Sequence, residues 1–154
     1  MAVSGYIVAL QVQPAFTDLV RRRKLLALAR RAMAAESVET PTELSIVIAD
    51  DETVQQLNHR YRGIDAPTDV LSFGMESADA FVMPSDSARL LGEIIISYVT
   101  AASQTDGSAG AIEDELAHLL VHGLLHLLGY DHEASDEAEA MRTREETLLG
   151  RAAH

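Results

Sequence analysis

The sequence predicts an α+β fold, in which one mixed sheet of about four strands packs against helices in a single domain over residues 1–154. Two observations carry this prediction. Strand-like and helical patterns follow one another as strand, helix, strand, helix, strand, loop, strand and then helices. The segment 109–128 has the length of a helix and is apolar nearly all round apart from its histidines, which predicts a central buried helix that covers one face of the sheet.

The chain is expected to begin with a strand and a helix. Residues 6–12 are rich in β-branched and aromatic residues and precede Pro14, which predicts a strand that ends there. Thr17 or Asp18 can cap a helix that runs to about Ala35. Its buried stripe is expected to contain Leu19, Leu25, Leu26, Ala29 and Met33.

A second strand and helix follow, and then a third strand. Residues 43–49 form an apolar run of strand length. Asp50 or Asp51 can accept a hydrogen bond from the first turn of the next helix, and Gly63 suits the left-handed position that closes it. Residues 68–73 then predict the third strand.

The second half of the chain carries one more strand and the remaining helices. Residues 74–88 contain Gly, Pro, Ser and Asp without periodicity and are expected to form a long loop. The three consecutive isoleucines of residues 93–97 predict a short buried strand, and 98–104 a brief helix. After the helix 109–128, a last helix is expected to begin at Ser135 or Asp136. Its core-facing residues are predicted to be Ala138, Met141, Thr147, and Leu148 or Leu149.

Composition limits the chemistry of the chain. It has no cysteine, which excludes disulfides, thiolate catalysis and cysteine-ligated metal sites. The net charge of −12 disfavours binding of nucleic acid through bulk charge, and no DNA is expected as a partner. The N-terminus shows neither a signal peptide nor a membrane span, so we expect a cytoplasmic protein with no membrane partner.

Positive charge is concentrated in the first part of the sequence. Eight of the twelve basic residues precede residue 63. For the first six of them, between Arg21 and Arg31, a solvated helix face is at least as good an explanation as nucleic-acid binding. The eight are Arg21, Arg22, Arg23, Lys24, Arg30, Arg31, Arg60 and Arg62.

Four of the six histidines lie between residues 118 and 132. His122 and His126 are four residues apart, so on a helix their imidazoles share a face and can bind one ion. Gly129 suits the left-handed position that stops a helix, after which the chain can turn so that His132 supplies a third nitrogen. Burying several uncompensated imidazoles costs about 1 to 3 kcal/mol each, so packing alone explains this cluster poorly. The pattern therefore predicts a metal site at His122, His126 and His132.

His118 is also four residues from His122, but about 12 Å of helix separates it from His126. One ion with bonds near 2.1 Å does not comfortably reach both. We therefore interpret His118 as a structural residue or one that supports a ligand, with direct ligation the minor alternative. Asp131 is a second candidate to support a ligand, although an aspartate in a turn is the commoner interpretation.

Three neutral nitrogens with a fourth position open describe a catalytic zinc site, with one ion per chain expected. Nickel and iron(II) remain alternatives, because these ligands suit them too. The spacing matches that of metzincin proteases, except that Gly123 occupies the position of their glutamate base. Peptide hydrolysis is therefore disfavoured, because the group that takes the proton from water is missing.

Beyond the metal pattern, the chain contains four distinctive blocks. They are His122 to His132 (HGLLHLLGYDH), Leu57-Asn58 with Tyr61-Arg62, Pro67 to Phe73 (PTDVLSF), and Leu91 to Ile94 (LGEI) with Ser97. In these blocks the chain resembles the YbeY-type endoribonucleases, the bacterial rRNA maturation factors. The resemblance spans most of residues 43–149, and Gly74 departs from it where the family usually has proline.

The resemblance implies a zinc-dependent endoribonuclease that cleaves single-stranded RNA, in maturation of the 3′ end of 16S rRNA and in ribosome quality control. It places the zinc ligands at His122, His126 and His132 and a functional arginine at Arg62, with catalytic roles expected for His122 and Arg62. The guanidinium of an arginine suits a phosphodiester. Expected partners are rRNA, the small ribosomal subunit and its assembly proteins. The alternatives are a metallohydrolase of another substrate class, such as a metzincin-like peptidase, and a zinc-stabilised assembly factor without catalytic activity.

Overall fold

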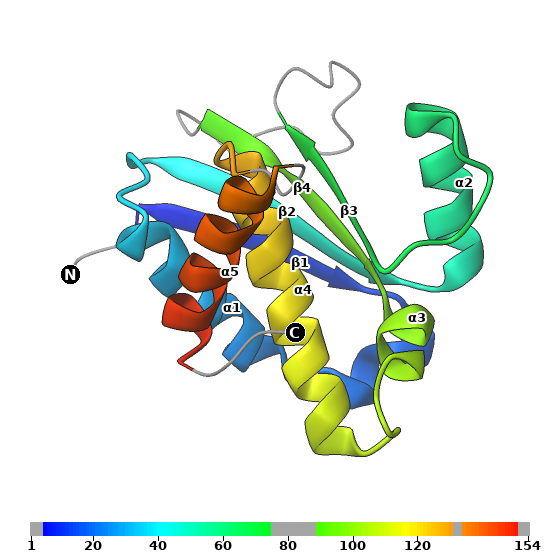
Figure 1. The fold of residues 1–154 in the computed structure, drawn as a ribbon. Coiled ribbons are helices and arrows are strands. Elements are labelled where there is room, and N and C mark those ends of the chain that lie inside the picture. The colour runs from blue at the N-terminus through cyan, green and yellow to red at the C-terminus, as the bar shows by residue number, and fades with distance from the viewer. Residues whose placement is uncertain (1–4, 75–88, 131–133, 151–154) are drawn as a thin grey trace.

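The computed structural model describes residues 5–74, 89–130 and 134–150, and its architecture is the predicted α+β domain (Figure 1). Four strands form one mixed sheet in the order β1-β2-β4-β3. Strands β1 (Tyr6–Val12), β2 (Thr42–Ala49) and β4 (Arg89–Ser97) are parallel, and β3 (Val70–Gly74) pairs antiparallel with β4 at the edge.

Between β1 and β2, the structure divides the single predicted helix into two. A 3-10 helix, η1 (Pro14–Leu19), is followed by α1 (Arg22–Ala35), because Val20 adopts an extended backbone between them. The predicted start at Thr17 or Asp18 is therefore wrong for α1. Leu19 is also exposed, at 57% of its surface, instead of lining the buried stripe. Phe16 is buried in its place and stacks on Tyr98 with ring centroids 4.8 Å apart.

Helix α2 (Asp51–Arg62) has the predicted ends. The side chain of Asp50 accepts a hydrogen bond from the backbone N–H of Thr53, and Gly63 closes the helix at a φ of 73°. Val54 is fully buried in a small core with Leu71, Phe73 and Ile95. This core lies on one face of the sheet.

The third and fourth strands differ from the prediction at their ends. β3 begins at Val70 instead of Thr68, and it ends at Gly74. β4 begins at Arg89 instead of Glu93, because its first residues pair with β2 and with Gly74. Most of the predicted loop, residues 75–88, lies outside the described residues.

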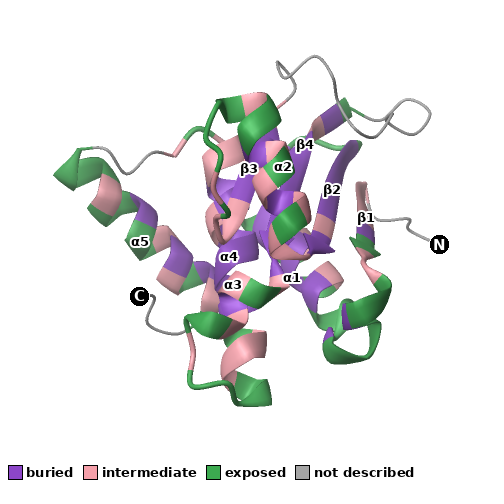
Figure 2. Ribbon diagram, turned by 90° about the vertical axis from the view of Figure 1, so that its right-hand side faces the viewer, coloured by how far each residue is buried: buried purple, intermediate pink, exposed green. Residues whose placement is uncertain are grey.

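The main core lies on the other face of the sheet, between the strands and helices α1, α4 (Ala109–Leu127) and α5 (Ser135–Leu149). Figure 2 shows buried positions running through the strands and α4. In β4, Ile94 and Ile96 belong to this core whereas Ile95 belongs to the α2 core, so α2 and α4 cover opposite faces of the sheet. The prediction of a central buried helix that carries the histidines is confirmed.

Helices α3 (Tyr98–Ser103) and α5 precede and follow α4 in the chain. Helix α3 leads toward α4, whose first turn is capped by Ser108. In α5, Met141 and Leu148 are buried as predicted, whereas Thr147 is exposed and the prediction for it is wrong. Among the described residues, no helix is long and apolar enough to cross a membrane.

Candidate metal centre

The structure brings His122 and His126 together on one face of α4. Their Nε2 atoms are 3.2 Å apart, and the two rings meet edge to face with centroids 4.7 Å apart. Both residues are half-buried. The four-residue spacing on a helix produces this convergence, because successive turns stack residues i and i+4. Two of the three predicted ligands therefore point at a common position.

The third predicted ligand, His132, lies outside the described residues, as does Asp131. The turn that leads to it is described as far as Tyr130. Gly129 has a φ of 103°, and the backbone N–H of Tyr130 donates to the carbonyl of Leu125. The predicted stop of the helix at a left-handed glycine is confirmed.

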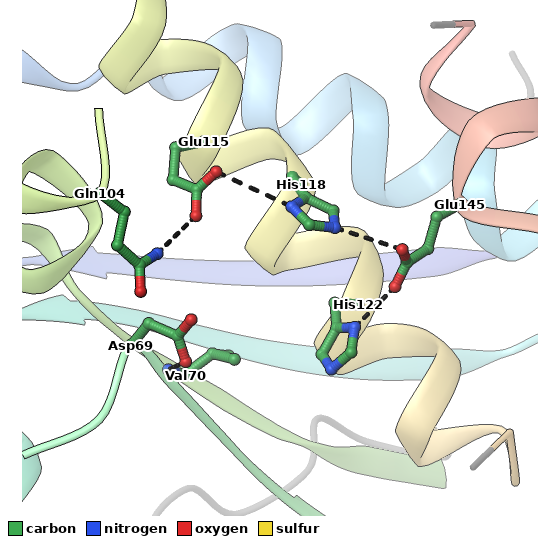
Figure 3. A network of polar contacts seen from close by, with 7 residues as sticks. All are labelled: Asp69, Val70, Gln104, Glu115, His118, His122 and Glu145. Carbon is green, nitrogen blue, oxygen red and sulfur yellow. Dashed lines mark hydrogen bonds and ion pairs between the residues drawn. The ribbon is translucent and has the colours of Figure 1, made fainter. Parts of the chain in front are cut away.

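A glutamate of α5 reaches the same part of α4 (Figure 3). Oε2 of Glu145 lies 2.6 Å from Nδ1 of His122, and Oε1 lies 3.2 Å from Nε2 of His118. The carboxylate is buried, and so is His118. One carboxylate of α5 thus connects two histidines of α4 that are one helical turn apart.

The pKa of Glu145 follows from these contacts. Burial favours the neutral form of a carboxyl group and by itself raises the pKa. Hydrogen bonds from His118 and His122, together with the positive charge that these rings can carry, outweigh burial and lower the pKa to about 2. Glu145 is therefore an anion at neutral pH, and it serves as an acceptor for both rings.

His118, His122 and Glu145 form a group that could hold a metal ion, with one ligand atom of each within 4.8 Å of the others. Tetrahedral zinc with bonds near 2.1 Å holds its ligand atoms about 3.4 Å apart. The 3.2 Å between Nε2 of His122 and Nε2 of His126 fits that spacing. The 2.6 Å between His122 and Glu145 is instead the length of a strong hydrogen bond.

Glu145 is the residue of this cluster that sequence analysis missed. The stripe predicted for α5 included Met141 and Leu148, and Glu145 lies between them at helical spacing, four residues after the first and three before the second. A charged residue on an apolar stripe needs a partner, because an unpaired buried charge is costly. That position was the available signal. The interpretation of His118 as a residue that supports a ligand is consistent with its contact to Glu145.

Gly123, which separates this site from a metzincin site, is tightly packed against the sheet. A Cβ added there would lie 2.9 Å from Cγ2 of Ile94 and 3.0 Å from Oγ of Ser72. The hydroxyl of Ser72 also donates to the carbonyl oxygen of Gly123. The helix therefore approaches β3 and β4 so closely that a side chain at this position would force its neighbours to shift, and the glycine itself carries no base.

Arg62 lies apart from the histidines in the fold. It is exposed in the last turn of α2, and α2 covers the face of the sheet opposite to α4. Strand β3, at the edge of the sheet, separates the two helices (Figure 1). A ligand that reaches both Arg62 and His122 must therefore pass around this edge.

Several of the clustered basic residues of α1 and its N-cap, Arg21, have structural partners. Arg22 donates to the carbonyl of Leu10 and Arg30 to that of Tyr6, which ties α1 to β1. Arg21 and Lys24 lie 3.4 and 3.3 Å from a carboxylate oxygen of Glu113 on α4. These contacts favour the interpretation of the cluster as a solvated, partly paired helix face.

Comparison with known proteins indicates one family for the sequence. The family model for Endoribonuclease YbeY matches residues 14–153. A protein of Roseiflexus castenholzii with that name is 45% identical over 146 residues, which is 94% of this chain and 91% of the relative. A Roseiflexus sp. relative of the same name is 46% identical over 151 residues, covering 97% and 94%.

A solved structure supports the fold. The solution structure of TM1509 from Thermotoga maritima superposes with a TM-score of 0.55 at 22% sequence identity, and the match covers 94% of this chain and 90% of the other. At this level of identity the similarity concerns the fold alone.

Proposed function

The chain belongs to the YbeY endoribonuclease family, and from this premise we propose a zinc-dependent hydrolase that cleaves single-stranded RNA in the maturation of the 3′ end of 16S rRNA and in ribosome quality control. The observation that carries the metal dependence is the convergence of His122 and His126, whose Nε2 atoms lie 3.2 Å apart on a half-buried helix face. An RNA substrate follows from the family.

The proposed ligands are His122, His126 and His132, with one zinc ion per chain. The donor set fits zinc, because neutral imidazole is a preferred ligand and the described pair has nearly the spacing of two tetrahedral positions. His122, His126 and His132 would hold the ion, and it would supply Lewis-acid chemistry that activates water or polarises a phosphoryl oxygen. His122 thereby acquires the catalytic role expected for it, as a ligand.

The remaining steps belong to the protein's own side chains. Glu145 accepts a hydrogen bond from Nδ1 of His122 and keeps the other ring nitrogen of His122 directed at His126. Because α4 packs closely on the sheet at Gly123, position 123 offers no base of the metzincin kind. We propose that Arg62 binds a phosphate of the RNA chain, which passes around the edge strand β3 to reach it.

The charge of the protein bears on its partners. A net charge of −12 opposes binding to an isolated polyanion, so we propose that the small ribosomal subunit and its assembly proteins supply much of the binding energy in the cytoplasm. Free RNA of random sequence is expected to bind weakly at physiological salt. Nanomolar affinity for such RNA would contradict this part of the proposal.

Cleavage assays with matched substrates test the proposal. Purified zinc-loaded protein is incubated with a single-stranded RNA, the same sequence in a duplex, and a ribosomal precursor that carries the 3′ end of small-subunit rRNA. We expect cleavage of the single strand and the precursor, loss of cleavage with a chelator, and recovery with zinc. His126→Ala should lower both zinc content and cleavage, and a variant that keeps both in full would refute the metal site.

The alternatives give different results in the same experiment. A peptidase would degrade casein in a chelator-sensitive manner, which the absence of a base at Gly123 disfavours. An assembly factor without catalytic activity would bind the precursor without cutting it. Mapping of rRNA ends in cells that lack the protein then tests the ribosomal role: unprocessed 3′ ends of small-subunit rRNA are expected.

A further inference from the structure

The two nitrogens of His122 face two different partners. Nδ1 lies 2.6 Å from Glu145 and Nε2 lies 3.2 Å from Nε2 of His126. A neutral imidazole carries one proton, on one nitrogen or the other. A carboxylate can only accept a hydrogen bond, so the contact with Glu145 requires the proton to be on Nδ1. The lone pair of Nε2 is then directed at His126, where the proposed metal binds.

We propose that Glu145 is a positioning residue for metal binding: it holds His122 in the Nδ1-protonated form and fixes the orientation of the ring. This inference rests on the proposed ligand role of His122 and names a residue that supports it from another helix. Carboxylates that accept the second N–H of a metal-binding histidine keep the ring in place and make it a better ligand. In this Nδ1-protonated form, Nε2 of His122 is an acceptor, 3.2 Å from Nε2 of His126.

Glu145 is itself held in place by His118. Nε2 of His118 is 3.2 Å from Oε1, so each oxygen of the carboxylate has a histidine partner. On its other side, Nδ1 of His118 lies 3.8 Å from Glu115, which accepts a hydrogen bond of 2.6 Å from Gln104 (Figure 3). A row of polar side chains thus runs from the end of α3 through α4 to Glu145 and His122.

The surroundings of Glu145 restrict it to one position. Met141 and Leu148 flank it on α5 and are both buried against the main core. Glu145 is 4% exposed, so it has little access to water. A buried carboxylate that moved away from His118 and His122 would lose both partners, which is costly in an apolar environment. Docking of α5 on α4 therefore fixes the orientation of His122.

Three variants separate positioning from a general structural role. Glu145→Leu removes the acceptor and keeps the volume, Glu145→Gln keeps one acceptor oxygen for His122, and Glu139→Gln, on the exposed side of α5, is the matched control. Zinc affinity is measured by competition with a chelator, and folding of the metal-free proteins by thermal unfolding. We expect Glu145→Leu to bind zinc about 10- to 100-fold more weakly, Glu145→Gln to lose less, and the control to match the parent.

A metal-free measurement tests the same inference without the proposed function. Nitrogen-15 NMR of the histidine rings at pH 8 reports which nitrogen of His122 carries the proton. We expect Nδ1 in the parent and in Glu145→Gln, and a shift toward Nε2 in Glu145→Leu. If zinc binding at His122 and His126 fails while Nδ1 is protonated, the metal site is wrong and the orientation of His122 by Glu145 stands.

Three outcomes would overturn the inference. The first is an NMR result that places the proton of His122 on Nε2 in the metal-free parent protein; this measurement requires no variant. The second is zinc affinity of Glu145→Leu equal to that of the parent. The third is zinc bound through Nδ1 of His122, together with an equal loss of zinc affinity in Glu145→Gln and Glu145→Leu. That result would make Glu145 a direct ligand, in a site formed by His118, His122 and Glu145.

Discussion

The hydroxyl of Tyr130 donates a 2.8 Å hydrogen bond to Oε1 of Glu36, a residue 94 positions earlier in the sequence. Glu36 follows the last turn of α1, and its other carboxylate oxygen accepts a hydrogen bond from Nε of Arg144 on α5. Tyr130 is also two residues before His132. One glutamate thus ties the chain at Tyr130 to α1 and α5, two helices of the main core.

Removing this hydroxyl tests the anchor. Tyr130→Phe keeps the ring and removes the donor, so the free energy of unfolding should fall by about 1 kcal/mol, the usual net value of such a hydrogen bond. Zinc affinity should fall as well, because the turn before His132 loses a restraint. Urea unfolding of the metal-free protein and chelator competition measure the two effects. Unchanged values for both would show that the anchor contributes nothing.

Gly123 and Gly110 are two glycines of α4 in opposite environments. A Cβ at Gly123 would lie 2.9 Å from a methyl group of Ile94, whereas a Cβ at Gly110 has no heavy atom within 4 Å. Gly123→Ala should therefore destabilise the protein by about 1 to 3 kcal/mol through overpacking. Gly110→Ala should be neutral or stabilise by up to about 1 kcal/mol, because alanine favours the helix. Chemical denaturation of both variants checks the contrast, and equal effects would contradict it.

The ends of an element could be predicted where residues next to it in the sequence determine them. Asp50 and Gly63 bound α2 as predicted, since a side-chain acceptor and a left-handed glycine act within one turn of the helix. The start of α1 could not be predicted in this way. Val20 is buried by tertiary packing, and its extended backbone ends η1 two residues before α1 begins. Pairing with β2, which is also tertiary, extends β4 to Arg89.

The candidate site was predictable where its residues are close in sequence. His122 and His126 are one helical turn apart, so their convergence follows from helix geometry alone. Glu145 is 23 residues from His122 and reaches it only because α5 packs on α4, which no local pattern specifies. For the same reason, the packing of Gly123 against Ser72 and Ile94 could not be predicted from the sequence. The absence of a base at position 123 could be predicted, because the residue itself shows it.

Glu93 is expected to make stability depend on pH. It is 5% exposed, Ser45 donates to its Oε2, and Oε1 accepts no hydrogen bond from the described residues. Burial raises the pKa of Glu93 above its usual value, and the hydrogen bond from Ser45 opposes the rise only in part. The folded state then binds more protons than the unfolded state between the two pKa values, so this group lowers stability as pH rises through that interval.

Glu93→Gln removes this dependence. The variant should gain stability relative to the parent as pH rises from below 4.5, the ordinary pKa, to neutrality, with about 1.4 kcal/mol for each pKa unit between the two states. Unfolding by urea at a series of pH values measures the difference. Glu139→Gln, an exposed glutamate of α5, is the control and should differ little from the parent at each pH. A Glu93→Gln difference that did not change with pH would contradict the burial argument.

Arg62 is expected to act on RNA without acting on the metal. It lies on α2, on the other face of the sheet from α4, so Arg62→Ala should leave zinc content unchanged. Loss of one phosphate contact should weaken RNA binding and cleavage. The slope of the logarithm of the binding constant against the logarithm of the salt concentration should become less steep by about one unit. Arg62→Lys keeps the charge and loses the planar guanidinium. Its binding should therefore depend on salt nearly as in the parent, whereas its cleavage rate should stay below that of the parent.

Arg60 provides the control on the same helix. Its guanidinium lies 5.0 Å from the centroid of the Tyr61 ring, and it is exposed like Arg62. Arg60→Ala removes an equal charge from the last turn of α2. If both variants reduce cleavage equally, the end of α2 contributes only its general positive charge. If only Arg62→Ala reduces cleavage, and its zinc content is intact, Arg62 binds a phosphate of the substrate. The RNA then passes around the β3 edge of the sheet to reach the histidines.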